Sequence, residues 1–307
     1  FTTVGVDTFG PWTVLARKTR GGVINNKRWA IMFSCLTTRA IHIEVIDEMS
    51  SSSFINALRR FEALRGPVKV FRSDKGANFV GAADELGMQA LNVEDGPIKK
   101  HLRENGTVWI FNSPHSSHMG GSWERMIGLT RRILDAILLD LNSKQLTHET
   151  LTTFMAEVCS IINSRPLVQI SSDPDSTLVL SPMMLLTGKV NYLPVIPESD
   201  NIKDMYRAQW KHVQVLSEIF WKHWRQDYLQ NLQPRRKWRD DRPNLKVGDV
   251  ILLKDSAVHR TDWPIGVITE TYQSSDGKVR KAPLRVHKDG QNVMYTRPIS
   301  EMVMLNC

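Results

Sequence analysis

The chain has 307 residues, of which 41% are hydrophobic and 23% charged. This composition is typical of a globular protein of two or three domains and excludes a disordered or fibrous chain. No run approaches the roughly 20 apolar residues that a membrane span needs, so no membrane partner is expected. Because the sequence begins at Phe1, inside an apolar run, we expect an upstream domain in the intact protein.

The positive charge is concentrated toward the C-terminus. The net charge is +8, and residues 201–307 hold 19 Lys and Arg against 12 Asp and Glu, whereas residues 1–200 hold 21 against 20. A local positive excess favours a polyanionic partner such as DNA, because phosphate contacts release condensed counterions. A solvated basic surface without a partner is an equally open interpretation of the charge alone.

The cysteines support neither a zinc site nor a disulfide framework. Cys35, Cys159 and Cys307 are widely spaced and form no CxxC pair. His115 and His118 resemble half of a zinc site, but without a cysteine pair nearby we interpret them as loop residues.

The first 74 residues predict an α/β order. Short β-branched or apolar runs predict strands separated by turns with Gly-Pro and Gly-Gly. Serine caps at Ser50–Ser53 predict a helix that ends at Gly66, and residues 68–71 predict a strand that delivers Asp74 to its end. The four strands predicted before that helix are Val4–Asp7, Trp12–Lys18, Arg28–Thr37 and Ala40–Ile46.

The middle of the chain predicts one more strand and two helices. Residues 108–111 form the candidate strand, and apolar residues then recur at helical spacing from Met119 to Leu138. A second helix is predicted from Thr147 to Asn163, before Pro166. We therefore place a core domain at residues 1–166.

The remainder predicts a helical connector followed by a small β-barrel. Residues 167–240 form the connector, with a short helical piece at Pro182–Leu186 and a long helical period over 201–233. Its tryptophans, Trp210, Trp221 and Trp224, are expected to pack in the interior rather than stack on bases. Residues 241–307 form the barrel domain. Its predicted strands are Val250–Leu253, Ile265–Glu270, Leu284–Val286 and Val293–Thr296, broken by turns at Asp276-Gly277 and Asp289-Gly290.

Three carboxylates stand out by position. Asp7 ends the first predicted strand, Asp74 ends a later one, and Glu124 lies near the start of a helix, off its apolar stripe. Converging carboxylates are the hard oxygen ligands that Mg²⁺ or Mn²⁺ prefers, and two such ions can serve phosphoryl transfer. Acids at these positions are also common turn formers and helix-dipole partners, so the residues alone leave both interpretations open.

Three sequence blocks carry these acids: Val4-Gly5-Val6-Asp7 with Phe9-Gly10-Pro11, Ser73-Asp74-Lys75-Gly76-Ala77-Asn78-Phe79, and His118-Met119-Gly120-Gly121-Ser122-Trp123-Glu124-Arg125. They resemble the signature blocks of retroelement integrases, most closely those of BEL/Pao long-terminal-repeat retrotransposons. The same family also shows blocks similar to Cys35-Leu36-Thr37-Thr38-Arg39-Ala40 and to Gly248-Asp249-Val250, so the resemblance covers nearly the whole chain.

The resemblance implies an α/β fold with an RNase H-like core, a mixed five-stranded sheet with flanking helices, and an SH3-like barrel that binds DNA. It implies a DDE-type polynucleotidyl transferase in which Asp7, Asp74 and Glu124 hold two Mg²⁺ or Mn²⁺ ions. The reactions would be 3′-end processing of element DNA and strand transfer into target DNA. Candidate DNA contacts are Lys75, Ala77, Asn78, Arg125, Arg131, Arg132, Arg235, Arg236 and Lys237.

Further expectations follow from the same family. The partners would be double-stranded element and target DNA and further copies of the chain, with no small-molecule substrate. The chain would be one part of a Pol polyprotein, acting in the nucleus and present in a cytoplasmic pre-integration particle. Asp74 and Glu124 lie 50 positions apart, longer than in retroviral integrases, which implies an insertion within residues 84–106. The alternative is a catalytically inactive, integrase-derived DNA-binding or assembly protein.

Overall fold

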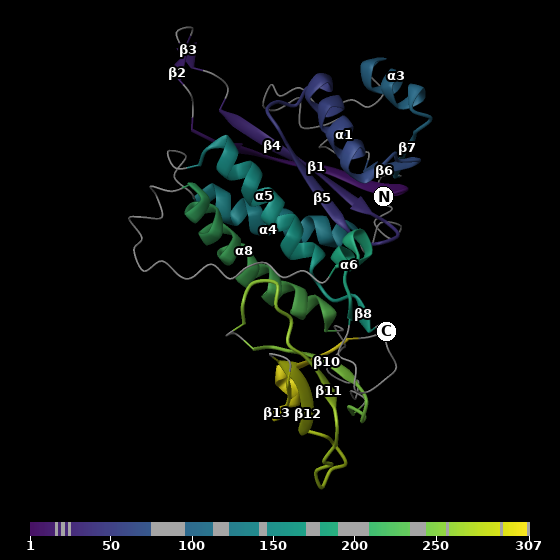
Figure 1. Ribbon diagram of the computed structural model, residues 1–307, viewed down its shortest axis with the longest axis vertical. Helices are drawn as coiled ribbons and strands as arrows, with labels where there is room; N and C mark the ends of the chain where they lie inside the picture. Colours follow the sequence, from purple (N-terminus) through teal and green to yellow (C-terminus); the bar gives the residue numbers. More distant parts are fainter. Residues whose placement is uncertain are drawn as a thin grey trace. The chain divides into compact units, whose positions relative to one another are not determined.

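In the computed structural model, the chain folds into two compact units (Figure 1). Unit 1 comprises Phe1–Ile162 and Glu198–Phe220, and unit 2 comprises Asn163–Pro197 and Trp221–Cys307. The long helix of the predicted connector is therefore divided between the two units. The residues that the structure describes are 1–15, 18–19, 22–23, 26–74, 96–112, 123–140, 146–169, 179–189, 209–233, 244–255, 258–288 and 291–305.

Unit 1 is built on a five-stranded mixed sheet with the strand order β5-β4-β1-β6-β7. Strand β4 is antiparallel to β1 and β5, whereas β6 and β7 run parallel to β1. The mixed α/β sheet that the sequence predicts is confirmed. Its strands are β1 (Thr3–Thr13), β4 (Lys27–Cys35), β5 (Ile41–Ile46), β6 (Val70–Asp74) and β7 (Val108–Asn112), and a small hairpin, β2 (Lys18–Thr19) with β3 (Gly22–Val23), follows β1.

Helices cover both faces of this sheet (Figure 1). Helices α1 (Ser51–Arg65) and α3 (Gly96–Glu104) lie on one face, and α4 (Trp123–Asp140) and α5 (His148–Asn163) lie on the other. Parallel strands need crossover connections, and α3 lies in the crossover between β6 and β7. The segment 84–106, which the resemblance marks as an insertion, thus contains a core helix from residue 96 onward, and its earlier part lies outside the described residues.

The ends of α1 form as the sequence predicts. The hydroxyl of Ser50 accepts a hydrogen bond from the Ser53 N–H at 3.2 Å, which satisfies one of the N–H groups left free at a helix start. Gly66 ends the helix with φ 86° and donates its N–H to the Glu62 carbonyl at 2.8 Å. Between these caps, α1 buries its apolar residues against the sheet, and Phe61 stacks on Phe33 with ring centroids 4.1 Å apart.

Strand β1 departs from the prediction. The sequence predicts two strands separated by a turn at Gly10-Pro11, but this prediction is wrong, because β1 is continuous and contains a register shift between Phe9 and Trp12. Gly10 has φ 112°, and a Cβ there would lie 3.0 Å from the Arg28 carbonyl oxygen. The one extra residue of this bulge changes which side chains share a face. Phe9 and Trp12 are both buried and in edge-to-face contact at 5.6 Å.

Unit 2 contains a five-stranded antiparallel sheet with the order β13-β12-β11-β10-β14. The four predicted strands are confirmed, and β14 was missed. The predicted turn at Asp276-Gly277 is also confirmed, since Gly277 has φ 74°, whereas Asp289-Gly290 lies outside the described residues. The strands are β10 (Val250–Leu253), β11 (Ile265–Ile268), β12 (Lys281–Lys288), β13 (Gln291–Pro298) and β14 (Met302–Met304), the last preceded by the 3-10 turn η1 (Ile299–Glu301).

Helix α8 (Gln209–Leu232) is bound to this sheet through its second part. The buried Arg225 guanidinium donates to the Leu253 carbonyl at 2.9 Å and to the Asp255 carbonyl, and Trp221 contacts Trp263 with centroids 5.0 Å apart. Trp221 and Trp224 are buried, as predicted. Trp210 is 54% exposed, so the interior position predicted for it is wrong. The rest of unit 2 includes α6 (Pro182–Thr187) and the paired strands β8 (Val168–Gln169) and β9 (Val179–Leu180).

Among the helices in the described part of the chain, none is long and apolar enough to cross a membrane.

Candidate active site

Asp7 lies in the middle of the core sheet. It belongs to β1, the central strand, and its side chain is half-buried. One carboxylate oxygen, Oδ1, accepts a hydrogen bond from the N–H of Thr8 at 2.8 Å. A backbone donor of this kind stabilises the charged form of a carboxylate and fixes its orientation.

The sheet register places Asp74 beside Asp7. Strands β1 and β6 are parallel neighbours, with Thr3 opposite Val70 and Gly5 opposite Arg72. The same offset, continued by two residues, pairs the position of Asp7 with that of Asp74. Adjacent strands lie about 4.8 Å apart, so the two backbone positions are close enough to share one ion.

Side chains alternate between the two faces along β1 and β6, and this alternation puts the positions of Asp7 and Asp74 on the same face of the sheet. Val4 and Val6 belong to the core cluster under α1, and so does Phe71 of β6. Alternate strand residues lie on opposite faces. The positions of Asp7 and Asp74 therefore belong to the other face, the one along which α4 runs.

Helix α4 brings Glu124 to the same end of this face. The helix is fastened to β1 by a hydrogen bond from the Trp12 indole N–H to Asp135 Oδ1 at 3.1 Å. Glu124 precedes Asp135 by 11 residues, or about 16 Å of helix. Asp7 precedes Trp12 by five residues, which span four residues of β4, from Met32 to Arg28, or about 13 Å of strand.

The running direction of α4 agrees with this placement. The N–H of Leu15, just after β1, donates to the carbonyl of Leu146, which follows α4 and precedes α5, at 2.7 Å. The C-terminal ends of β1 and α4 thus lie at one end of the sheet. Asp7, in the middle of β1, and Glu124, at the start of α4, both precede this end in their elements.

The positions of Asp7 and Asp74 thus belong to neighbouring strands, and Glu124 is in the first turn of the helix that runs along β1. Three carboxylates are a donor set that fits Mg²⁺ or Mn²⁺, which take carboxylate oxygens. The side chains of Asp74 and Glu124 lie outside the described residues. Among the side chains that are described, no group of three His, Cys, Asp or Glu gathers that could hold a metal. The fit consequently rests on the backbone positions of the strands and helix together with the chemistry of the three carboxylates.

The predicted DNA contacts on α4 are arranged around its polar side. Arg125 and Arg132 are exposed, and Arg131 is half-buried with its Nε 3.8 Å from Asp135 Oδ2. Glu124, Gly128, Arg131 and Asp135 follow one another at helical spacing, as predicted. The other candidates lie outside the described residues: Lys75, Ala77, Asn78, Arg235, Arg236 and Lys237, together with His115 and His118.

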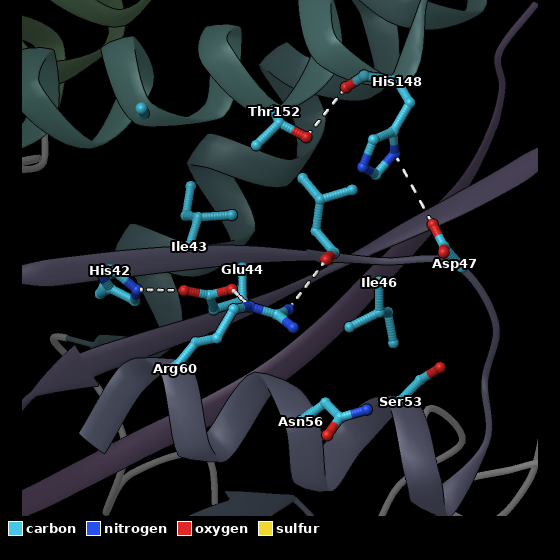
Figure 2. A pocket seen from close by; sticks show the side chains of 12 residues that line it. His42, Ile43, Glu44, Ile46, Asp47, Ser53, Asn56, Arg60, His148 and Thr152 are labelled. Carbon is cyan, nitrogen blue, oxygen red and sulfur yellow. Dashed lines mark hydrogen bonds and ion pairs between the residues drawn. The ribbon is translucent and has the colours of Figure 1, made fainter. Parts of the chain in front are cut away.

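A polar pocket of ≈ 420 Å³ lies at the edge of the sheet formed by β5, where this strand meets α1 and α5 (Figure 2). Glu44 of β5 lies near its centre. Its Oε1 is 2.8 Å from His42 Nε2, and its Oε2 accepts from Arg60 Nε at 2.6 Å. Burial raises the pKa of Glu44, but the hydrogen bonds with His42 and Arg60 outweigh burial, so the pKa is lowered.

The Glu44 cluster makes a testable contribution to stability. A carboxyl whose folded pKa is depressed stabilises the fold above its unfolded pKa, near 4.5, and loses this contribution as pH falls through the folded pKa. We expect Glu44→Gln to lower the free energy of unfolding by about 1–2 kcal/mol at pH 7 and the difference from wild type to vanish in acid. Urea titrations at several pH values measure this. A constant difference across pH would contradict it, and Glu104→Gln, in an exposed pair with Lys100, is the control with little expected effect.

Sequence reasoning missed two groups of residues. One is the Trp12–Asp135 hydrogen bond, for which the only local signal was the 11-residue spacing from Glu124 to Asp135. The other is the Glu44 cluster, whose members on β5 gave no signal beyond strand alternation, because Arg60 reaches it from α1.

The chain is similar to a protein family over its C-terminal part and to solved structures over its length. A family of unknown function, DUF5641, matches residues 208–305, which include α8 and the sheet of unit 2. No curated protein matches the chain. Among solved structures, a chain of the cryoEM structure of the simian T-cell lymphotropic virus intasome in complex with PP2A regulatory subunit B56 gamma is similar, with a TM-score of 0.39 and 10% identity, over 99% of this chain and 78% of that one. A likeness this slight carries no conclusion about function.

Proposed function

We propose that the chain is the catalytic and C-terminal part of a BEL/Pao-type retrotransposon integrase, a DDE polynucleotidyl transferase with an RNase H-like core. The observation that supports the proposal is the register of the parallel strands β1 and β6, in which Thr3 pairs with Val70 and Gly5 with Arg72. The same offset, continued by two residues, would bring Asp7 level with Asp74 at the end of β6. Helix α4 carries Glu124 in its first turn and is joined to β1 by the hydrogen bond from Trp12 to Asp135. Each of the three integrase-like sequence blocks supplies one acid to this arrangement.

The chain's own residues would bind and orient the reacting groups. Asp7, Asp74 and Glu124 would hold two Mg²⁺ or Mn²⁺ ions, which when bound activate the attacking oxygen and stabilise the leaving oxygen in an in-line displacement. The three acids would serve as ligands, and the hydrogen bond from the Thr8 N–H would orient the Asp7 carboxylate. Arg125, Arg131 and Arg132 would contact the DNA backbone along α4.

Unit 2 would supply the second DNA-binding element. The basic excess of residues 201–307, with 19 Lys and Arg against 12 Asp and Glu, supports this role. We interpret its five-stranded sheet as the SH3-like barrel and the run Arg235–Lys237 as a phosphate contact. The assembly that joins two element ends would be a multimer acting in the nucleus, within a particle that first forms in the cytoplasm.

Strand transfer tests the proposal directly. A labelled duplex with the element's terminal sequence is incubated with plasmid and Mg²⁺ or Mn²⁺, using this chain and one extended upstream within its polyprotein. We expect metal-dependent joining by at least one of them. If both bind DNA but neither joins it, the chain is instead a non-catalytic, integrase-derived DNA-binding protein; cleavage without joining would indicate an RNase H-type nuclease.

A further inference from the structure

The hydrogen bond between β1 and α4 holds together two elements that carry the proposed metal ligands. Trp12 is 2% exposed and donates its indole N–H to Asp135 Oδ1 at 3.1 Å, across 123 residues of sequence. We propose that Trp12 and Asp135 are a positioning pair: they set the rotation and height of α4 so that Glu124 stays level with Asp7. This inference rests on the proposed function.

The pair is built to fix one orientation. Indole N–H has a single donor direction, and Trp12 is held in place by burial and by its edge-to-face contact with Phe9. The other carboxylate oxygen, Asp135 Oδ2, lies 3.8 Å from Arg131 Nε, one turn earlier on the same helix. Both oxygens of Asp135 therefore face a partner, and a turn of the carboxylate away from Trp12 would lose the indole hydrogen bond.

Helix geometry transmits this constraint to Glu124. Eleven residues are about three turns of α-helix, so Asp135 and Glu124 lie on nearly the same side of α4. A slip of one residue would turn Glu124 by about 100° and move it by about 1.5 Å. Displacements of about 1 Å at a reacting group can cost about a hundredfold in rate, so a fixed register matters at this site.

The bulge in β1 completes the arrangement. In an uninterrupted strand, Trp12 would share a face with Val4 and Val6, because even-numbered residues alternate with odd ones. The register shift between Phe9 and Trp12 moves Trp12 to the α4 side of the sheet. The bulge in β1 thus makes the hydrogen bond between Trp12 and Asp135 possible.

Three variants separate positioning from simple stability. Trp12→Phe keeps the ring but removes the donor, and Asp135→Leu removes the acceptor. Asp135→Asn keeps an oxygen that can accept from Trp12, so it serves as the conservative rescue. Leu134→Ala is the matched control, because Leu134 is fully buried in α4 and its side chain has no hydrogen-bonding group.

The measurement is Mn²⁺ binding, followed as the rise in Tm of the full chain with added Mn²⁺, alongside kcat and KM for strand transfer. We expect Trp12→Phe and Asp135→Leu to raise the half-saturating Mn²⁺ concentration about 10- to 100-fold and to lower kcat with little change in KM for DNA. Asp135→Asn should stay within about threefold of wild type. Leu134→Ala should lower Tm without changing the half-saturating concentration.

The outcomes distinguish the two proposals. If the wild-type Tm rises with Mn²⁺ but Trp12→Phe responds at the same concentration, the positioning role is overturned while the metal site stands. An equal weakening of Mn²⁺ binding in Leu134→Ala would overturn it as well, because loss of packing would then suffice. No Mn²⁺ response in the wild type would overturn the proposed metal site and the inference together. Where Trp12→Phe fails to fold, the comparison of Asp135→Leu with Asp135→Asn decides.

Discussion

Replacing Asp74 by asparagine is expected to reduce metal-dependent strand transfer by about 1,000-fold or more while leaving the fold intact. Asparagine has nearly the same shape, so β6 and its pairing with β1 should persist. The amide is neutral and is a much weaker ligand for a divalent cation than a carboxylate. Strands β1 and β6 contain no acid besides Asp7 and Asp74, so no other acid in the two strands can replace Asp74.

Three measurements are needed for this variant. Strand transfer is assayed with Mg²⁺ and with Mn²⁺, Tm reports folding, and a filter or anisotropy assay reports DNA binding. Glu149→Gln is the matched control, since Glu149 is an exposed acid in the first turn of α5, where its charge complements the helix dipole. Substantial joining by a folded Asp74→Asn chain would remove Asp74 from the metal site.

Replacing Gly10 by alanine is expected to lower the free energy of unfolding by about 3 kcal/mol. Two costs add together at this position. The φ of 112° is unfavourable for a residue with a side chain, and the added Cβ would lie 3.0 Å from the Arg28 carbonyl oxygen and 3.2 Å from the Trp29 Cα. Both neighbours are backbone atoms of β4, so relief requires the two central strands to move apart.

Gly66→Ala separates the two costs. Gly66 also has positive φ, 86°, but no atom of the described residues would lie within 4 Å of a Cβ at this position, so only the conformational cost of about 1–2 kcal/mol should appear. Urea unfolding of both variants measures the difference. Equal losses of unfolding free energy in the two variants would show that β4 moves away from the added Cβ at little cost. Because the bulge also carries Trp12, we expect Gly10→Ala to weaken Mn²⁺ binding and Gly66→Ala to leave it unchanged.

Several elements were predictable because their signals are local. The caps at Ser50 and Gly66 act within four residues, and the apolar spacing of α4 repeats every turn. The end of β6 at Asp74 followed in the same way from a short apolar run. The turn predicted at Gly10-Pro11 failed, because a Gly-Pro pair fits both a turn and a bulge and only the partner strand β4 decides between them.

The sequence alone determined which residues are available for the proposed chemistry: three acids in three recognisable blocks, a basic C-terminal third, and the helices and strands that carry them. Only the tertiary structure decided which positions meet. The pairing of β1 with β6, the bond from Trp12 to Asp135 and the contact of Arg60 with Glu44 all join residues from different elements. Such contacts depend on sheet order, register and helix rotation, which packing of the whole core selects and no local stretch of sequence encodes.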